Sequence, residues 1–217
     1  AEPPAEPPAE PPASSPPPPP FVIRRARAAH VDQVAQITRD EARHSAASVA
    51  SGDEPLERWR ADWEAQAPLY PWLVALDPRR PAGEEVVGYA KASPFNPRDG
   101  FRWSVALSVY LKPDVKGAGL GAALYGELFP LLRAQGYLRV YARIALPNPP
   151  SQALHERFGL RQTGVLPRFA WKFGRWFDMG IYTGSLVEDE RAPRAVVGVE
   201  EACLTGLTGA RHLLCAD

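Results

Sequence analysis

A glycine-rich turn between an apolar strand and an apolar helix constrains this chain more than any other feature. The turn reads Lys116-Gly117-Ala118-Gly119-Leu120-Gly121-Ala122; a strand pattern over residues 103–111 precedes it, and a helical pattern over residues 120–135 overlaps its end. The first N–H groups of a helix have no partner inside the helix and carry partial positive charge. Glycines let the backbone approach an anion closely, so a turn of this kind is suited to phosphate. Lys112 and Lys116 add positive charge beside it.

Several interpretations of this turn compete. A P-loop requires Gly-Lys-Ser/Thr, which the chain lacks. A dinucleotide turn fits Gly117, Gly119 and Ala122, but residues 112–116 separate the strand from the first glycine, and residues 138–144 carry no carboxylate for a ribose. A coenzyme A pyrophosphate loop, [Q/R]-x-x-G-x-[G/A], fits if Lys116 replaces Gln or Arg. The remaining interpretation is a plain left-handed turn before a helix.

Hydrophobic periodicity predicts an α+β fold with the element order βααβββαβαββ. The expected strands are residues 22–25, 72–76, 86–92, 103–111, 138–144, 161–166 and 178–182, and the expected helices are 31–42, 55–67, 120–135 and 151–158. Residues 1–20, with three AEPP units and five consecutive prolines, are predicted to be a disordered tail because proline has no N–H donor. Residues 21–182 are then one domain, and residues 183–217 an irregular C-terminal extension.

Composition argues against several functional classes. The 25 Lys and Arg residues balance 25 Asp and Glu residues, so no overall basic field attracts nucleic acid or an anionic membrane. The chain contains no run of 18 uncharged apolar residues, so no membrane-spanning helix is predicted. Cys203 and Cys215 are too few for a zinc site, so no metal is expected, and both are expected to be free thiols in the cytoplasm.

Four segments in order resemble the GNAT acetyltransferases, and within them the phosphinothricin / methionine sulfone N-acetyltransferase group. The segments are YPWLVA (70–75), SVYLKPDVKGAGLGAALY (108–125), LPNPPSQALHERFGL (146–160) and KFGRWFDMGIY (172–182). The resemblance implies a mixed sheet of about seven strands with helices on both faces. It implies transfer of an acetyl group from acetyl-CoA to the amine of a small molecule, such as an amino acid or its analogue. Family members often dimerise, so a homodimer is expected.

The resemblance also implies how acetyl-CoA binds. Two parallel strands, here residues 103–111 and 138–144, separate, and the pantetheine arm pairs with the exposed edge as an added strand would. Val109, Tyr110 and Leu111 then present main-chain atoms to the arm. The pyrophosphate is expected on Lys116, Gly117, Ala118, Gly119, Leu120, Gly121 and Ala122. Asn148 is expected to bond the arm, unless it serves only as a turn residue, and Ser151 is expected to N-cap the next helix.

The catalytic assignment is less complete. His155, in the LHE segment, is expected to point toward the sulfur and move the proton, although a packed histidine fits the pattern too. Related enzymes carry a glutamate as presumed base on the central strand, and Ala106 stands at its position here. No carboxylate lies between Arg102 and Leu111. Arg98 matches a family arginine that faces the acceptor, and a solvated loop arginine is the alternative.

Two other functions remain open at this stage: acetylation of peptide or protein amines, which requires an open groove, and acetyl-CoA binding without catalysis, which the missing glutamate suggests. A pocket with aromatic walls would favour a small-molecule acceptor. The aromatic residues near the C-terminal end of the domain are predicted to be core and dimer surface rather than a cofactor cage: Phe169, Trp171, Phe173, Trp176 and Phe177.

Overall fold

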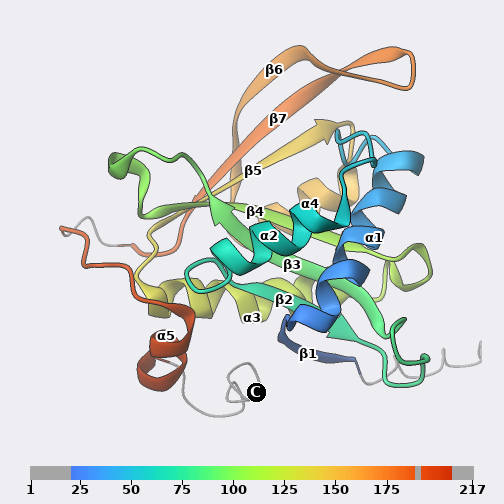
Figure 1. The fold of residues 1–217 in the computed structure, drawn as a ribbon. Coiled ribbons are helices and arrows are strands. Elements are labelled where there is room, and N and C mark those ends of the chain that lie inside the picture. Colours follow the sequence, from blue (N-terminus) through green and yellow to red (C-terminus); the bar gives the residue numbers. More distant parts are fainter. Residues whose placement is uncertain (1–20, 189–191, 207–217) are drawn as a thin grey trace, which may run out of the picture.

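The computed structural model describes residues 21–188 and 192–206, which fold around one seven-stranded sheet (Figure 1). The strand order is β1-β2-β3-β4-β5-β7-β6. Only β4 and β5 are parallel, and every other neighbouring pair is antiparallel. The strands are β1 (Val22–Arg25), β2 (Trp72–Leu76), β3 (Val86–Pro94), β4 (Ser104–Leu111), β5 (Arg139–Leu146), β6 (Arg161–Lys172) and β7 (Arg175–Ser185).

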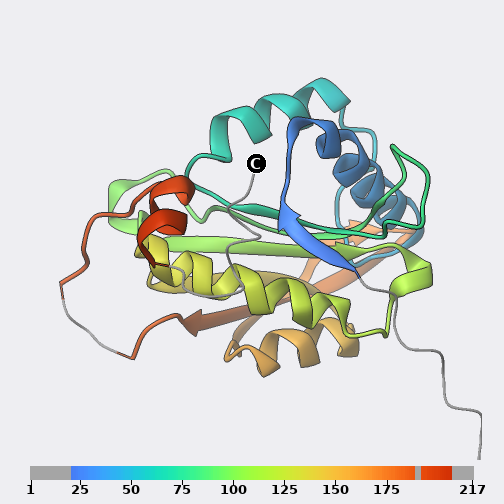
Figure 2. The same ribbon diagram turned by 90° about the horizontal axis from the view of Figure 1, so that it is seen from below.

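Helices cover both faces of the sheet, as the family resemblance implies (Figure 2). One face carries α1 (Ala28–His44) and α2 (Leu56–Gln66), and the other carries α3 (Leu120–Gln135) and α4 (Pro149–Arg157). The α1 helix buries residues three and four apart, including Val31, Val34 and Ala35, because an amphipathic helix turns one stripe toward a sheet. The observed order up to β7 is the predicted one.

The α3 helix forms the centre of the larger hydrophobic core. Its buried side chains in this core are Leu120, Leu124, Tyr125, Leu128, Phe129, Leu131 and Leu132, which pack with apolar residues of β2 to β5. Gly136 ends the helix in a left-handed conformation (φ 97°), as expected of a C-terminal glycine. This helix is therefore held firmly from end to end, which fixes the position of the glycine turn at its beginning.

The C-terminal part differs from the prediction of an irregular extension. Strand β7 continues to Ser185, and α5 (Val199–Gly206) packs against α3. Val199, Ala202 and Cys203 are apolar at helical spacing, and all three are buried. Cys203 is disulfide-bonded, so the expectation of two free thiols is wrong. Residues 1–20 and Cys215 lie outside the described residues.

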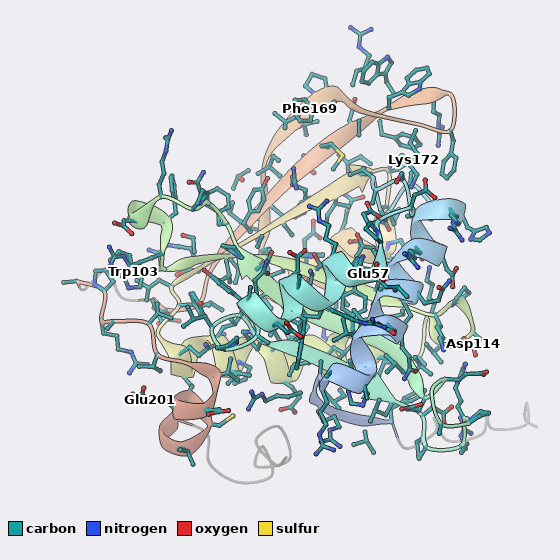
Figure 3. All side chains as sticks on the ribbon, viewed as in Figure 1. Glu57, Trp103, Asp114, Phe169, Lys172 and Glu201 are labelled. Carbon is teal, nitrogen blue, oxygen red and sulfur yellow. The ribbon has the colours of Figure 1, made fainter. Side chains whose placement is uncertain are left out.

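The β6–β7 hairpin is much longer than predicted and projects beyond the body of the molecule (Figure 1). Of the five aromatic residues predicted to form core and dimer surface, Phe177 is buried in the core, and the other four expose half or more of their surface, so their place on a dimer surface stays a prediction: Phe169 (62%), Trp171 (60%), Phe173 (56%) and Trp176 (54%). They lie near the turn of the hairpin, in the part that projects beyond the rest of the sheet. The Lys172 ammonium ties the hairpin to the segment after α1 by donating to the Ser45 carbonyl at 3.0 Å and to the Ser48 carbonyl (Figure 3).

Candidate active site

The two parallel strands separate part-way along their length. Strands β4 and β5 pair at Ser104 with Arg139, Val105 with Val140, and Ala106 with Tyr141. Beyond Ala106, β4 continues on β3 and β5 continues on β7. The opening between them, visible in Figure 1, leaves one side of each strand without a strand partner. Such an edge accepts an extended ligand as it would accept an added strand.

Strand parity shows which main-chain groups face this opening. The Trp103 carbonyl accepts from the Leu138 N–H at 2.9 Å, on the β5 side, whereas the Lys112 N–H donates to the Val87 carbonyl at 2.8 Å, on the β3 side. Main-chain directions alternate along a strand, so odd-numbered residues of β4 point toward β5. Val109 and Leu111 therefore face the opening. The main chain of Tyr110 faces β3.

The glycine turn leads into α3 with two residues in the left-handed region. Gly117 has φ 84° and Gly119 has φ 79°, and an added Cβ would meet no atom within 4 Å at either position. The backbone angle, not space, therefore requires glycine there. Gly121 differs, because its Cβ would meet Leu154 Cδ2 at 3.1 Å, so it lets α3 and α4 pack closely.

The beginning of α3 presents free donors. The first intrahelical bond runs from the Ala123 N–H to the Gly119 carbonyl at 3.0 Å. The N–H groups of Leu120, Gly121 and Ala122 consequently have no acceptor in the helix, and the helix dipole adds positive potential. This arrangement suits a diphosphate.

The two lysines near the turn have other partners. The Lys116 ammonium forms an ion pair with a Glu41 carboxylate oxygen of α1 at 2.8 Å, and the Glu41 side chain is only 10% exposed. The Lys112 ammonium donates to the Glu84 carbonyl at 3.1 Å. Neither ammonium is therefore held against the beginning of α3 in this structure.

Asn148 caps α4, and the prediction that Ser151 does so is wrong. The Ser151 N–H donates to Asn148 Oδ1 at 3.3 Å. Pro149 and Pro150 take the first helical positions, where a missing N–H costs nothing. The amide oxygen of Asn148 is thus occupied by the cap, and its NH2 group forms no hydrogen bond with other described residues.

His155 is buried and both of its ring nitrogens are occupied. Its Nδ1 lies 2.7 Å from the Ser151 carbonyl, which only accepts, so Nδ1 carries the hydrogen. Its Nε2 lies 3.0 Å from the Tyr125 hydroxyl, which donates. Burial lowers the pKa of His155 and therefore favours the neutral ring. The structure thus directs His155 toward Tyr125 of α3, and the predicted role in proton transfer stays a prediction.

Ala106 lies on the face of the sheet that carries α1 and α2. Val105 and Leu107 turn toward the core around α3, so Ala106 turns the opposite way. Its neighbours across the sheet are Ser93 and Tyr141. A cavity of about 440 Å³ adjoins Tyr141, and its lining includes Phe95, Phe101, Ser104 and Arg139.

The walls of this cavity are partly aromatic. The ring centroids of Phe95 and Tyr141 are 4.9 Å apart, and those of Phe95 and Phe101 are 5.2 Å apart, both in edge-to-face geometry. Arg98 lies on the exposed loop between them, where its N–H donates to Asn96 Oδ1 at 3.0 Å. Its guanidinium has no hydrogen bond or ion pair with the described residues, and its predicted role toward the acceptor stays a prediction.

Three residues near the site were not predicted from the sequence: Lys91, Glu41 and Tyr125. A lysine inside the apolar strand pattern of residues 86–92 was a usable signal for Lys91. The other two lie on helices, and nothing local distinguishes them from surface or core positions.

No group of three His, Cys, Asp or Glu side chains in the described residues is placed to hold a metal ion. Among the same residues, no helix is long and apolar enough to span a bilayer.

The chain is similar in sequence to known acetyltransferases. The model of the Acetyltransferase (GNAT) family matches residues 31–160. Phosphinothricin N-acetyltransferase of Streptomyces viridochromogenes is 34% identical over 163 residues, which are 75% of this chain and 86% of that protein. L-methionine sulfoximine/L-methionine sulfone acetyltransferase of Pseudomonas paraeruginosa is 36% identical over 172 residues, 79% of this chain and 98% of that protein.

A solved structure agrees at the level of the fold. The phosphinothricin acetyltransferase of Sinorhizobium meliloti, crystallised with AcCoA, matches with a TM-score of 0.75 and 31% identity. The match covers 82% of this chain and 95% of that one. The separated strands and the glycine turn of the present chain thus occur within a fold that is known to hold this thioester in that protein.

Proposed function

The chain belongs to the GNAT acetyltransferase family, and we propose that it transfers the acetyl group of acetyl-CoA to the amine of a small amino acid or amino acid analogue. The observation that carries the proposal is the opening between β4 and β5 with the beginning of α3 beside it. The opening offers the unpaired main-chain edge that a pantetheine arm needs. The turn from Gly117 to Ala122 offers the free N–H groups that a diphosphate needs.

The chain's own groups supply the main elements of the transfer. An N–H of Val109 or Leu111, facing the opening, stabilises negative charge as it develops on the thioester oxygen. Binding both substrates side by side removes most of the entropic barrier. A proton must reach the leaving thiolate, and we assign its donation to the Tyr125 hydroxyl, which His155 Nε2, a bare acceptor 3.0 Å away, holds in position. The resulting tyrosinate regains a proton from solvent after the product leaves.

The acceptor fits the α1/α2 face of the sheet, beside Ala106. The cavity bounded by Phe95, Phe101 and Tyr141 has partly aromatic walls, which favours a small molecule over a peptide chain. Arg139 lines this cavity and supplies positive charge suited to a carboxylate or phosphinate, and Arg98, on the loop between Phe95 and Phe101, is proposed to add to it. The names of the relatives, phosphinothricin and methionine sulfone acetyltransferases, point to the same class of acceptor.

The projecting hairpin supports a homodimer. Four exposed aromatic side chains on one ribbon are unusual for a monomer, and a second copy of this chain would remove them from water. The cytoplasmic location expected from the sequence stays a prediction.

One assay tests the proposed function. Purified protein is mixed with acetyl-CoA, and release of free thiol is followed over the common amino acids, phosphinothricin, methionine sulfone and short peptides. Turnover with one or more amino acids or analogues, and slower turnover with peptides, is expected. Binding of acetyl-CoA in calorimetry without turnover on any amine would show a non-catalytic homologue instead. Preferential turnover of peptides would show the peptide-acetylating alternative.

A further inference from the structure

The α1/α2 face of the sheet carries a titratable side chain close to Ala106. Strands β3 and β4 pair without a register shift, with Lys91 opposite Ser108 and Ser93 opposite Ala106. Residues directly opposite in antiparallel strands project to the same face, and diagonal neighbours are about 7–8 Å apart, within reach of a long side chain. Lys91 therefore shares its face with Ser108 and Ala106.

The Lys91 ammonium occupies an aromatic environment. Its Nζ lies 4.2 Å from the ring centroid of Trp72 on β2 and 5.1 Å from that of Trp59 on α2. Across residues 21–188 and 192–206, no hydrogen bond or ion pair to this atom is formed. Such a nitrogen is available for a reaction, whereas most lysines on a protein surface are fully hydrated.

Burial shifts the pKa of the Lys91 side chain. Desolvation lowers the pKa of Lys91 to about 8, and the charge of Asp62 on α2 opposes that effect. Two tyrosines are also near, Tyr89 on the same strand and Tyr110 diagonally opposite on β4. Burial raises the pKa of both hydroxyls, so neither carries charge near neutrality.

Other bases in the region are already engaged. The Glu41 carboxylate is ion-paired with Lys116 at 2.8 Å. His155 lies on α4, on the opposite face of the sheet, and both of its nitrogens are hydrogen-bonded (Figure 2). On the face that carries Ala106, the neutral Lys91 amine thus offers a free lone pair from the strand next to β4, whereas the Asp62 carboxylate lies on α2.

We propose that Lys91 takes the proton from the acceptor's ammonium group, in place of the carboxylate that Ala106 lacks. The inference rests on the proposed function. The neutral amine of Lys91 accepts one proton from R–NH3⁺, which becomes R–NH2 and attacks the thioester carbon, and Lys91 Nζ becomes –NH3⁺. The flexible four-carbon stem carries Nζ from the tryptophans toward Ser108 and back. The two indole faces then stabilise the ammonium until it releases the proton to solvent.

The test compares Lys91→Arg and Lys91→Met with wild type in the thiol-release assay, at saturating acetyl-CoA from pH 6 to 10. Arginine keeps the charge and the contact with the tryptophans but stays protonated throughout this range. Both variants are expected to lose about 100-fold in kcat/KM for the acceptor near neutrality. The rise of the wild-type rate with an apparent pKa near 8 should disappear from both. Arg58→Met, which removes an exposed cation from α2, is the matched control and should behave as wild type.

A second substitution separates a chemical role from a structural one. Ala106→Glu in the Lys91→Met background should recover at least about tenfold of the lost rate and move the ascending limb toward acidic pH, because a carboxylate then accepts the proton. Acetyl-CoA affinity should be equal in all variants. A wild-type rate in Lys91→Arg, or an unchanged pH profile in Lys91→Met, would overturn the role of Lys91 alone. Absence of turnover in the wild type would overturn the proposed function, and this inference with it.

Discussion

Replacing Gly119 by alanine isolates the backbone requirement of the glycine turn. Gly119 has φ 79°, and an added Cβ has no heavy atom within 4 Å, so the substitution creates no clash. Its cost is the left-handed conformation itself, about 1–2 kcal/mol for a residue with a Cβ. The part of this strain that the apo-protein keeps lowers its free energy of unfolding, and the part that it relieves by relaxing the turn appears as weaker acetyl-CoA binding, so the two effects together sum to that amount.

The same strain predicts the effect on acetyl-CoA. A turn that relaxes to a negative φ no longer aims the N–H groups of Leu120, Gly121 and Ala122 at one point, and binding must restore the strained form. A turn that relaxes fully adds about 1–2 kcal/mol to the cost of binding, which corresponds to roughly a 5- to 30-fold rise in Kd, whereas a turn that stays strained leaves the Kd unchanged and loses stability instead. Calorimetry with acetyl-CoA measures the Kd, and urea unfolding measures the stability of the same sample.

Gly126→Ala is the matched control, because it places the same methyl group on the same helix. Gly126 has no atom within 4 Å of an added Cβ and no positive φ. Alanine is a better helix former than glycine by about 0.8–1 kcal/mol, so this variant should gain stability and bind acetyl-CoA as wild type does. The reasoning is refuted if Gly119→Ala keeps wild-type stability and wild-type affinity, or if both variants lose affinity alike.

Four further predictions concern separate parts of the chain. His155→Ala should slow turnover by about tenfold or more with little change in acetyl-CoA affinity, and an unchanged rate would remove His155 from the mechanism. Glu41→Gln frees the Lys116 ammonium and removes a negative charge near the turn, so calorimetry should show acetyl-CoA binding about two- to fivefold more tightly. The Asp77 carboxylate is hydrogen-bonded to Arg79, which holds the pKa of Asp77 well below its usual value. It therefore stabilises the fold above the unfolded pKa of about 3.9 and loses that contribution as pH falls, so the melting temperature of Asp77→Asn should change less than that of wild type between pH 5 and 2. Trp171→Ser, on the exposed hairpin, should shift sedimentation from dimer to monomer without altering the far-ultraviolet circular dichroism spectrum.

The sequence by itself predicted the elements and their order because those signals are local. Apolar spacing of 3.6 or 2 residues identifies a helix or a strand within a short window, and the bounds of β2 and α3 match the prediction to the residue. The glycine turn was equally readable, since a positive φ demands glycine wherever it occurs in a chain. The family segments added the expectation of an opening between two strands.

Tertiary structure decided everything that depends on which elements meet. The Lys116–Glu41 ion pair joins residues 75 apart in sequence, and no local pattern announces it. The placement of Lys91 on the same face as Ala106, diagonally across from it, follows from the register of β3 against β4, which a period of two leaves undetermined. Asn148 rather than Ser151 caps α4 because two prolines fill the first turn. Helix α5 was missed because its short apolar pattern acquires meaning only when it packs against α3. Sequence periodicity reports which face of an element is buried, whereas pairing between distant strands and helices is settled by the packing of the whole chain.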